Sequence, residues 1–459
     1  MRDTEPYISF VVTARNDDHG GNLLRRMQIF VTGLIEQTKR HNLSAELILV
    51  EWNPVPDRPR LYEALSWPRE KGPCKVRVIE VSSDIHKRFR YSDQLALFQM
   101  IAKNAGIRRA RGRFVLATNI DLLFSDELVA ALASRSQDPE AMYRIDRYDV
   151  SSDVPIHATV EEQMEYCRRN VIRVNRRDGT FRLNELHWLW LRRIRTRVRT
   201  LYGYLLRFLP SRPKITLRPA MRMRFVIRNV TQRMRYEGHL FMRATRLFGR
   251  AAWLSMKGYL TPSEVVLAFC FSTYLIFTKI SVALGNGIDM LSNSCSALVG
   301  NMSKSSVSFF VGRASLFSRG ARLLRIWLFP IYPRLHTNGC GDFTLMAREH
   351  WHALRGYPEL EMFSFNLDSV LCHMAYQLGV REEVFRDPMR IYHVEHTSGW
   401  TPEGESKMIE RLRVMSIPML DFRQFESWAT KMQKERRPMI LNDEGWGLAS
   451  EQLPERVIE

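Results

Sequence analysis

The sequence has few cysteines, and they do not form closely spaced pairs. Six cysteines are scattered over 459 residues without a CxxC motif, at Cys74, Cys167, Cys270, Cys295, Cys340 and Cys372. A small secreted scaffold needs a dense set of cysteines, so this spacing excludes a disulfide-stapled protein. We expect these residues to be reduced thiols in a cytosolic setting.

Targeting signals, repeats and low-complexity tracts are also lacking. The N-terminus, MRDTEPYISF, contains acidic residues and no apolar h-region, so we predict a cytoplasmic protein without a secretory signal. One apolar run, 265–284, is as long as a membrane span and has Lys279 as its single charge. Serines and threonines interrupt this run, which favours a buried or interface-lying helix over a span.

Acidic residues are scarce in one segment only. Residues 168–250 contain 22 arginines and one lysine against three acidic residues, from chain totals of 68 basic and 49 acidic residues. The remainder, with 45 basic and 46 acidic residues, is therefore close to neutral. Arginines interleaved with aromatics such as Trp188 and Tyr204 fit an anionic membrane surface, with the protein peripheral on its cytoplasmic face.

Two other interpretations of this basic segment stay open. Arginines and aromatics together could bind the phosphates and bases of a nucleic acid, although no recognisable RNA- or DNA-binding motif accompanies them. The segment could also be a solvated basic face packed on the protein core or on an acidic partner.

Apolar runs typical of buried strands alternate with helical patterns from the N-terminus onward. We predict strands at 7–14, 45–50, 76–81, 114–118 and 142–147, and helices at 23–38, 92–109 and 128–133. This alternation predicts an α/β fold, in which right-handed crossovers connect the strands of a mostly parallel, Rossmann-like sheet flanked by helices. After residue 336 we expect helices at 347–354 and 367–377, and a strand at 391–394.

The change of pattern near residue 150 divides the chain into four parts. Residues 1–150 form a first α/β half, and 151–335 a mainly helical, arginine-rich insertion. Residues 336–404 form a second α/β half. Residues 405–459 are expected to be surface helices ending in a polar tail.

The segment RGRFVLATNIDLLF places two polar side chains directly after a buried strand. Asn119 and Asp121 follow the apolar run 114–118, and the carboxyl ends of strands are where ligands bind in an open α/β sheet. Two oxygen-bearing side chains two residues apart could hold a hard divalent cation that bridges the phosphates of a nucleotide. A strand that simply ends in a polar turn is the competing interpretation.

Neighbouring motifs resemble family-2-type glycosyltransferases of the GT-A fold. The segment AKNAGIRRARGRFVLATNID, from Ala102 to Asp121, is similar to the helix, basic turn and strand that lead into the DxD motif of that family. The strand exits VVTARND and LILVEWN resemble the same half of the fold. Asn119 departs from DxD, whereas Asp121 retains the position that usually contacts the metal.

A second block of resemblance covers residues 336–404. NGCGDFTLMAREHWHALRGYPE is similar to the acceptor-side stretch of these transferases, and FNLDSVLCHMAYQLGV to the helix that carries their catalytic base, here Asp368. RIYHVEH offers His393 and His396 to complete a metal site. The Gln/Arg-x-x-Arg-Trp motif of processive polysaccharide synthases is absent from the sequence.

The resemblance implies an inverting glycosyltransferase that uses a UDP- or GDP-linked sugar donor, an unknown acceptor hydroxyl, and Mn²⁺ or Mg²⁺. It implies Asp121 and a histidine of the RIYHVEH segment as metal ligands. Residues three apart on a regular strand point to opposite faces, so we expect at most one of the two histidines to be a ligand and favour His393. A hydrogen-bonded core or surface histidine is the competing interpretation for either one. Asp368 is the implied catalytic base. Gly341, Asp342 and Trp400 are expected at the acceptor. The residues expected at the nucleotide sugar are Ala14, Arg15, Asn16, Glu51, Asp93, Lys103, Asn104, Asn119 and Asp121.

Structural roles compete with several of these assignments. Glu51 could be a solvated strand end, Lys103 an exposed helix charge and Asp368 a helix N-cap. Because Asn119 replaces an aspartate, a catalytically inactive GT-A-like scaffold protein is an alternative function, and nucleic-acid binding through the basic segment is another.

Overall fold

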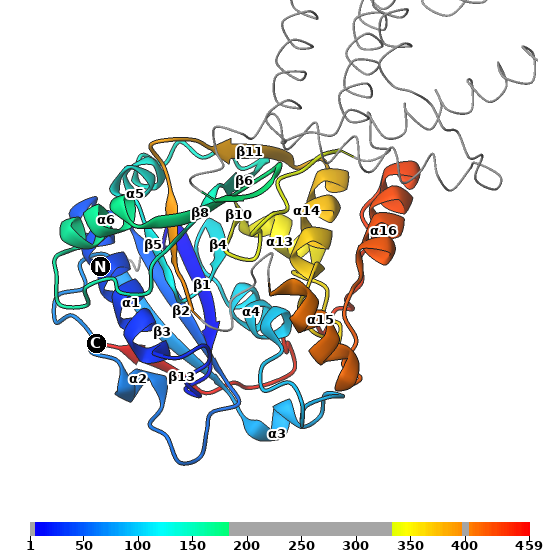
Figure 1. Cartoon of the computed structure of the whole chain (residues 1–459), viewed down its shortest axis with the longest axis horizontal. Coiled ribbons are helices and arrows are strands. Elements are labelled where there is room, and N and C mark those ends of the chain that lie inside the picture. The colour runs from blue at the N-terminus through cyan, green and yellow to red at the C-terminus, as the bar shows by residue number, and fades with distance from the viewer. Residues whose placement is uncertain (1–4, 183–332, 397–403) are drawn as a thin grey trace, which may run out of the picture. The chain divides into compact units, whose positions relative to one another are not determined.

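The computed structural model describes residues 5–182, 333–396 and 404–459. They form an α/β fold around an eight-stranded sheet with the strand order β11-β6-β10-β4-β1-β2-β3-β13 (Figure 1). Its centre consists of β1 (Ile8–Ala14), β2 (Ala45–Trp52), β3 (Cys74–Val81) and β4 (Phe114–Thr118), which run parallel to one another. These are four of the predicted strands, and their order places β1 between β2 and β4.

The outer strands make the sheet mixed rather than mostly parallel throughout. Strand β10 (Phe343–Ala347) runs antiparallel to β4 and to β6 (Ala141–Ile145), while β11 (Arg381–Phe385) runs parallel to β6. The C-terminal strand β13 (Glu455–Ile458) is antiparallel to β3, so the chain ends in the sheet and not in a polar tail. The rule of right-handed crossovers predicts parallel pairing only for strands joined by βαβ units. Strands β10 and β13 follow loops, so the rule does not apply to them.

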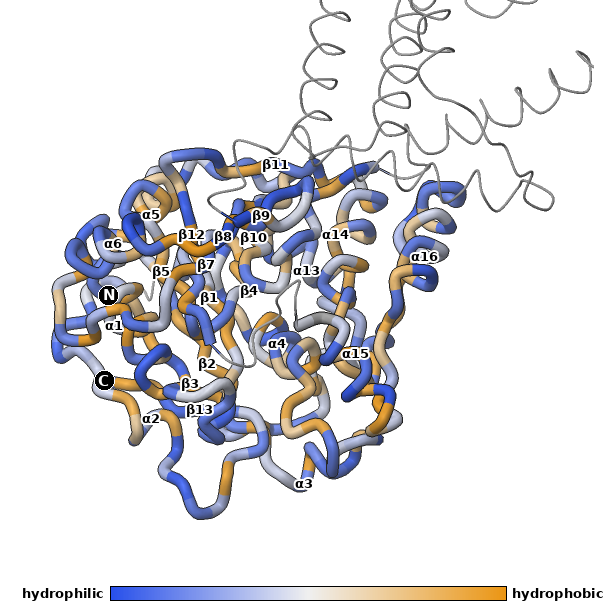
Figure 2. Tube along the Cα trace, in the orientation of Figure 1, coloured by the Kyte–Doolittle hydropathy of each residue, from blue (hydrophilic) through white to orange (hydrophobic). Residues whose placement is uncertain are grey.

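The central strands are buried at nearly every position because both faces of the sheet are covered. Phe10, Leu47 and Leu116 face one core, and their neighbours in the chain face the other. The first core is covered by α1 (Leu23–Arg40) and α5 (Asp126–Ala133), and the second by α4 (Gln99–Arg108), α13 (Arg348–Leu354) and α14 (Leu367–Leu378) (Figure 1). Figure 2 shows hydrophobic residues along these strands and hydrophilic residues on the outer helix faces.

A second, five-stranded sheet was not anticipated from the sequence. Its order is β5-β12-β7-β8-β9, formed by β5 (Leu122–Phe124), β12 (Ile391–Val394), β7 (Arg147–Val150), β8 (Val171–Arg176) and β9 (Gly179–Arg182). With α6 (Val160–Arg169), this sheet extends the α/β fold beyond residue 150, as far as Arg182. It also joins the two predicted halves, because β12 pairs with both β5 and β7.

The first arginines of the basic segment are neutralised within this fold. Arg173 forms ion pairs with Asp149 and Glu395, and Arg177 with Glu382. Arg168 and Arg169 on α6 pair with glutamates of α5 and α6, and Arg176 of β8 pairs with Asp146. In this part of the segment the arginines therefore pair with carboxylates of the same fold, and Arg173 alone of the five is buried.

The remaining helices are α2 (Leu61–Ala64), α3 (Ser83–His86), α15 (Glu405–Val414) and α16 (Phe422–Glu435). The helix predicted from Ser92 begins only at Gln99. The preceding residues form turns, in which the Ser92 carbonyl contacts the His86 ring and Phe98 packs on Trp52. No helix among the described residues is long and apolar enough to cross a membrane. The run 265–284, the segment 183–332 and Trp400 lie outside them.

Candidate functional site

The carboxyl ends of the central strands meet at one edge of the main sheet. Ala14 ends β1 and lies opposite Glu51 of the parallel strand β2. Strand β4 ends at Thr118, and the antiparallel β10 begins opposite it at Phe343. Asn119, which follows β4, and Asp342, which precedes β10, are therefore at the same edge although they lie far apart in the sequence.

Asp121 lies at the centre of a group of buried polar side chains. Its Oδ2 atom accepts a hydrogen bond from Arg26 Nη1 at 3.1 Å and lies 3.2 Å from His396 Nε2 and 3.7 Å from His393 Nε2. Its Oδ1 atom is buried and has no hydrogen-bond partner among the described residues. A buried carboxylate oxygen without a partner is costly, so this atom is suited to bind a cation.

Both histidines approach Asp121 because the strand that contains His393 ends before His396. Strand β12 ends at Val394, whose amide donates to the Asp121 carbonyl at 2.9 Å. His396 lies two residues beyond the strand, so the alternation of a regular strand does not apply to it. The atoms of Asp121, His393 and His396 that could coordinate a metal all lie within 4.8 Å of one another.

Asp149 lies behind the ring of His393. Its Oδ1 atom lies 3.2 Å from His393 Nδ1, which leaves Nε2 directed at Asp121. Asp149 is fully buried on β7 and is itself held by Arg147 and Arg173. Metal-binding histidines usually have such a carboxylate behind the ring, because it fixes the tautomer and raises the basicity of the ligand.

Electrostatics keep both carboxylates of this group ionised. Burial raises the pKa of Asp121, but the charges of His393, His396 and Arg26 more than offset it, and its pKa lies well below the ordinary value. Asp149 behaves in the same way, with Arg147, His393 and Arg173 offsetting burial and leaving its pKa below the ordinary value. Both carboxylates are therefore negatively charged at neutral pH, and each lies beside at least one arginine.

The position where the resembling family has an aspartate belongs to a hydrogen-bond network. Asn119 Nδ2 donates to Asp342 Oδ1 at 2.5 Å, and Asn119 Oδ1 accepts from Gln99 Nε2 at 3.2 Å. Asp342 Oδ2 pairs with Arg147 Nη1 at 2.5 Å, and Asp342 is 5% exposed. Asn119 and Asp342 are thus held by protein groups at the sheet edge.

Lys103 connects this network to the proposed base. The Lys103 side chain is fully buried, so it is not an exposed helix charge, and Nζ donates to the Gly341 carbonyl at 2.6 Å. Burial lowers its pKa to about 8, although Asp342, Asp368 and Asp121 all act to raise it. Carboxylates from both blocks of resemblance therefore act on one ammonium group.

Asp368 lies in the first turn of α14, largely buried, above the small-residue loop. Asn366, and not Asp368, is the N-cap of this helix. A Cβ atom on Gly341 would lie 2.9 Å from Asp368 Oδ2, so a larger residue at this position would displace the carboxylate. Burial raises the pKa of Asp368, and hydrogen bonds from Cys340 and the Ser369 amide partly offset this effect.

Asn104 joins the two blocks of resemblance but does not face the Asp121 group. Its amide donates to the Tyr357 carbonyl at 2.8 Å and to Glu359 at 2.9 Å, and its oxygen accepts from the Tyr357 amide at 2.9 Å. A Cβ atom on Gly356 would lie 2.2 Å from Asn104 Oδ1. Asn104 therefore holds the 356–359 turn against α4.

The other residues expected at the nucleotide occupy varied positions. Glu51 is 1% exposed, so it is not a solvated strand end. Its Oε2 atom accepts a hydrogen bond from the Leu61 amide, and its Oε1 atom has no hydrogen-bond partner among the described residues. Arg15 and Asn16 bond to the carbonyls of Asn53 and Pro59. Asp93 is exposed in the turns before α4.

Sequence reasoning missed Arg26 and Asp149, and only Arg26 leaves a signal in the sequence. Arg26 lies three residues after Leu23 and four before Phe30, on the apolar face of α1, where a charge needs a buried partner. Asp149 lies in the segment RYDV, which shows no apolar pattern, and its burial appears only in the structure. A charged residue at a position that the pattern buries is a general indication of an ion pair or a site.

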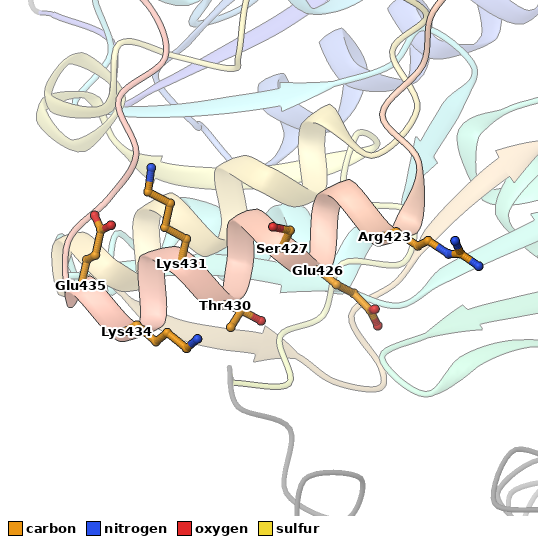
Figure 3. Close-up of a pocket in the computed structure, with 7 residues that line it drawn as sticks. All are labelled: Arg423, Glu426, Ser427, Thr430, Lys431, Lys434 and Glu435. Atoms are coloured by element: carbon orange, nitrogen blue, oxygen red, sulfur yellow. The ribbon is translucent and has the colours of Figure 1, made fainter. Parts of the chain in front are cut away.

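Two other places were considered as sites. Glu140, Glu349 and His350 form a more exposed group, and acidic residues often cluster this way without binding an ion. A surface depression runs along α16 and is lined by that helix alone, with its side chains directed outward (Figure 3). Neither includes Asp121, His393 or His396. The four described cysteines are buried and free, including Cys340 and Cys372.

Comparison of the chain with protein-family models and with curated proteins found no match.

Proposed function

We propose that the protein is a GT-A-type glycosyltransferase that moves a sugar from a UDP- or GDP-linked donor to an acceptor hydroxyl, with inversion and with the help of a divalent cation. The observation that carries this proposal is the convergence of the two blocks of resemblance. Asp121 of the first block lies beside His393 and His396 of the second. Lys103 of the first contacts the Gly341 carbonyl of the second.

Asp368 is the proposed general base. Attack by a hydroxyl on the anomeric carbon requires a group that removes the proton, and a carboxylate with a pKa raised toward neutrality does so efficiently. Burial raises the pKa of Asp368, and the loop at Gly341 leaves its Oδ2 atom in a defined position. A separate base and a direct attack on the sugar give inversion.

The Asp121 group fits a divalent cation by its donor atoms. Asp121 Oδ1 is buried without a hydrogen-bond partner among the described residues, and two imidazoles lie within reach of the same carboxylate. Oxygen with nitrogen ligands suits Mn²⁺ better than Mg²⁺. When bound, such an ion neutralises the negative charge that develops on the departing diphosphate. Asp149 keeps His393 in the orientation this requires.

Glu51 is proposed to contact the base or ribose of the donor. It lies on β2 beside Ala14, at the edge where nucleotides bind in open α/β sheets. Its Oε1 atom is buried without a hydrogen-bond partner among the described residues, so a donor group of the nucleotide would satisfy it.

Turnover of nucleotide sugars tests the proposal. The full-length protein is incubated with UDP- and GDP-sugars and Mn²⁺, and release of the nucleoside diphosphate is measured in the wild type, Asp121→Ala and Asp368→Asn. Activity in the wild type that falls at least about a hundredfold in both variants supports the assignment. Asp126→Asn is the control. Asp126 lies on α5, is half-exposed and pairs with Arg40 and His41, so its loss should leave turnover unchanged. A wild type that neither turns over nor binds any nucleotide contradicts the proposal.

The alternative function, a catalytically inactive GT-A-like scaffold protein, is supported by the contacts of Asn119 and Asp121. Asn119 and Asp342 satisfy each other, and Arg26 already pairs with Asp121, so protein groups occupy much of the position where the resembling family binds its metal. This alternative predicts nucleotide binding without release of sugar, which the same assay combined with calorimetry distinguishes from turnover.

The basic segment is proposed to bring the enzyme to an anionic membrane surface. Its arginines up to Arg177 are paired within the fold, so the test uses those between 192 and 199. Substitution of all five by glutamine in the full chain is expected to abolish flotation with phosphatidylserine vesicles, with neutral vesicles as the control. Unchanged flotation contradicts this, and salt-sensitive binding of RNA lost in the same variant favours nucleic acid instead.

A further inference from the structure

Arg26 contacts the carboxylate that is proposed to bind the divalent cation. It lies on the buried side of α1 with 4% of its surface exposed, and Nη1 donates to Asp121 Oδ2 at 3.1 Å. An arginine is always protonated in proteins, so Asp121 has a permanent positive charge beside it. The charge of the only carboxylate in the Asp121, His393 and His396 group is thereby offset before any ion binds.

The guanidinium of Arg26 is not free to reach outward. Nε and Nη2 donate to the Gly21 carbonyl at 3.3 and 3.2 Å, and Nη2 also contacts the His19 carbonyl. With the bond to Asp121, four of its five N–H groups are directed at the protein. Arg26 therefore holds the loop before α1 against Asp121, and it is not placed to bind a phosphate itself.

The two oxygens of Asp121 have different environments as a result. Oδ2 faces Arg26 and both imidazoles, whereas Oδ1 is buried without a hydrogen-bond partner among the described residues. A divalent ion at Oδ1 would have the Arg26 charge close by, and like charges at such short range repel strongly in a buried site. Negative charge from another source is needed to offset that repulsion.

We propose that Arg26 makes the binding of a divalent cation at Asp121 depend on a diphosphate. The cation alone binds weakly, because Arg26 offsets the charge of Asp121, and a nucleoside diphosphate supplies the missing negative charge. This inference rests on the proposed function, because it concerns the same Asp121 site. Arg26 is then a positioning residue, which acts on the affinity of the ion through its contact with Asp121. Binding is reciprocal, so the ion tightens the nucleotide by the same factor.

Binding of Mn²⁺ to the full-length wild type is the first measurement. Free Mn²⁺ is counted by electron paramagnetic resonance, without addition and in the presence of UDP, GDP or inorganic pyrophosphate, and the Mn²⁺ that each of these binds in a protein-free sample is subtracted to give the Mn²⁺ bound with the protein. We expect at least about tenfold tighter binding with a nucleoside diphosphate, a factor typical of strong coupling between sites. Equal tightening by pyrophosphate assigns the effect to the diphosphate group, and tightening by the nucleotides alone shows that the nucleoside is needed as well; both support the proposal. Equal Mn²⁺ affinity with and without all three overturns it.

Variants of two neighbouring arginines separate charge at Asp121 from charge on the helix. Arg26→Met is expected to bind Mn²⁺ alone at least about tenfold more tightly than the wild type, with most of the coupling lost, and Arg26→Lys to keep the coupling. Arg25→Met is the matched control, because Arg25 donates to the Ser152 and Val154 carbonyls and not to Asp121. Unchanged Mn²⁺ affinity in a folded Arg26→Met, or the same tightening in Arg25→Met, overturns the proposal.

The outcomes also separate this inference from the proposed function. If Arg26→Met does not fold, as judged by thermal melting, the coupling in the wild type and in Arg26→Lys decides. Mn²⁺ that binds tightly without a diphosphate overturns the role of Arg26 and leaves the transferase proposal standing. A wild type that binds neither Mn²⁺ nor nucleotide in any combination overturns both.

Discussion

Asn119 donates a hydrogen bond to Asp342 at 2.5 Å, across a sequence separation of 223 residues. This contact links the end of β4 to the start of β10 at the edge where the proposed site lies. It also gives a physical reason for the amide at position 119. An aspartate there would set two carboxylates against each other, whereas an asparagine can donate to Asp342.

Replacement of Asn119 by aspartate should therefore destabilise the protein rather than restore a DxD motif. We expect a loss of about 2 kcal/mol or more in the free energy of unfolding, measured by urea denaturation at pH 7. Asn119→Ala removes only the hydrogen bond and should cost about 1 kcal/mol. Equal stability of the two variants would show that repulsion from Asp342 is absent.

Substitution of Gly341 by alanine should impair turnover without unfolding the protein. The new Cβ atom would lie 2.9 Å from Asp368 Oδ2 and displace the proposed base. We expect kcat for nucleotide-sugar turnover to fall at least about tenfold, because displacement of a catalytic group costs much of its contribution, with KM for the donor little changed. Gly33→Ala on α1 is the control, since its Cβ would meet nothing within 4 Å. Wild-type kcat in Gly341→Ala would argue against Asp368 as the base.

Loss of the Asp149 carboxylate should weaken Mn²⁺ binding through His393. Asp149→Asn removes the charged group 3.2 Å from His393 Nδ1, and changes of this kind cost about 10- to 100-fold in metal affinity. The measurement is Mn²⁺ binding in the presence of UDP, for variants confirmed as folded by circular dichroism. Asp146→Asn removes a nearby carboxylate that pairs with Arg176 and His336 instead. The prediction fails if both variants bind Mn²⁺ equally well.

Glu51 should make stability depend on pH in a defined window. Burial raises its pKa from 4.5 to about 7, so the folded state keeps the proton while the unfolded chain loses it as the pH rises between these values. Its contribution is thus fully present below pH 4.5 and is lost by about pH 7, a change of roughly 3 kcal/mol. Glu51→Gln should remove this dependence and gain relative stability at pH 8. Parallel stability curves of variant and wild type from pH 5 to 8 would contradict the assignment.

Local sequence patterns were sufficient for the central strands and for α1. The strands are buried on both faces, so residues such as Phe10 and Val11 give continuous apolar runs that are easy to recognise. The turns before Gln99 were misjudged as helix, because their contacts with Trp52 and His86 come from elsewhere in the chain. The strand β13 was missed for a similar reason, since its polar sequence pairs only with the edge of β3.

The candidate site was partly foreseen through the resemblance and partly decided by the tertiary structure. Asp121, Asp368 and His393 could be named from motifs, because Asp121 follows a recognisable strand, Asp368 lies in the first turn of a helix and His393 lies within a short strand. Three other contacts come from the tertiary structure. The pairing of β12 with β5 and β7 brings His396 to Asp121 and Asp149 to His393. The packing of α1 brings Arg26 to Asp121. The sequence by itself determined which segments form the central strands and α1, since the spacing of apolar residues is a local property of the chain. Only the tertiary structure decided which charges meet, because the order of strands brings together residues that no local pattern connects.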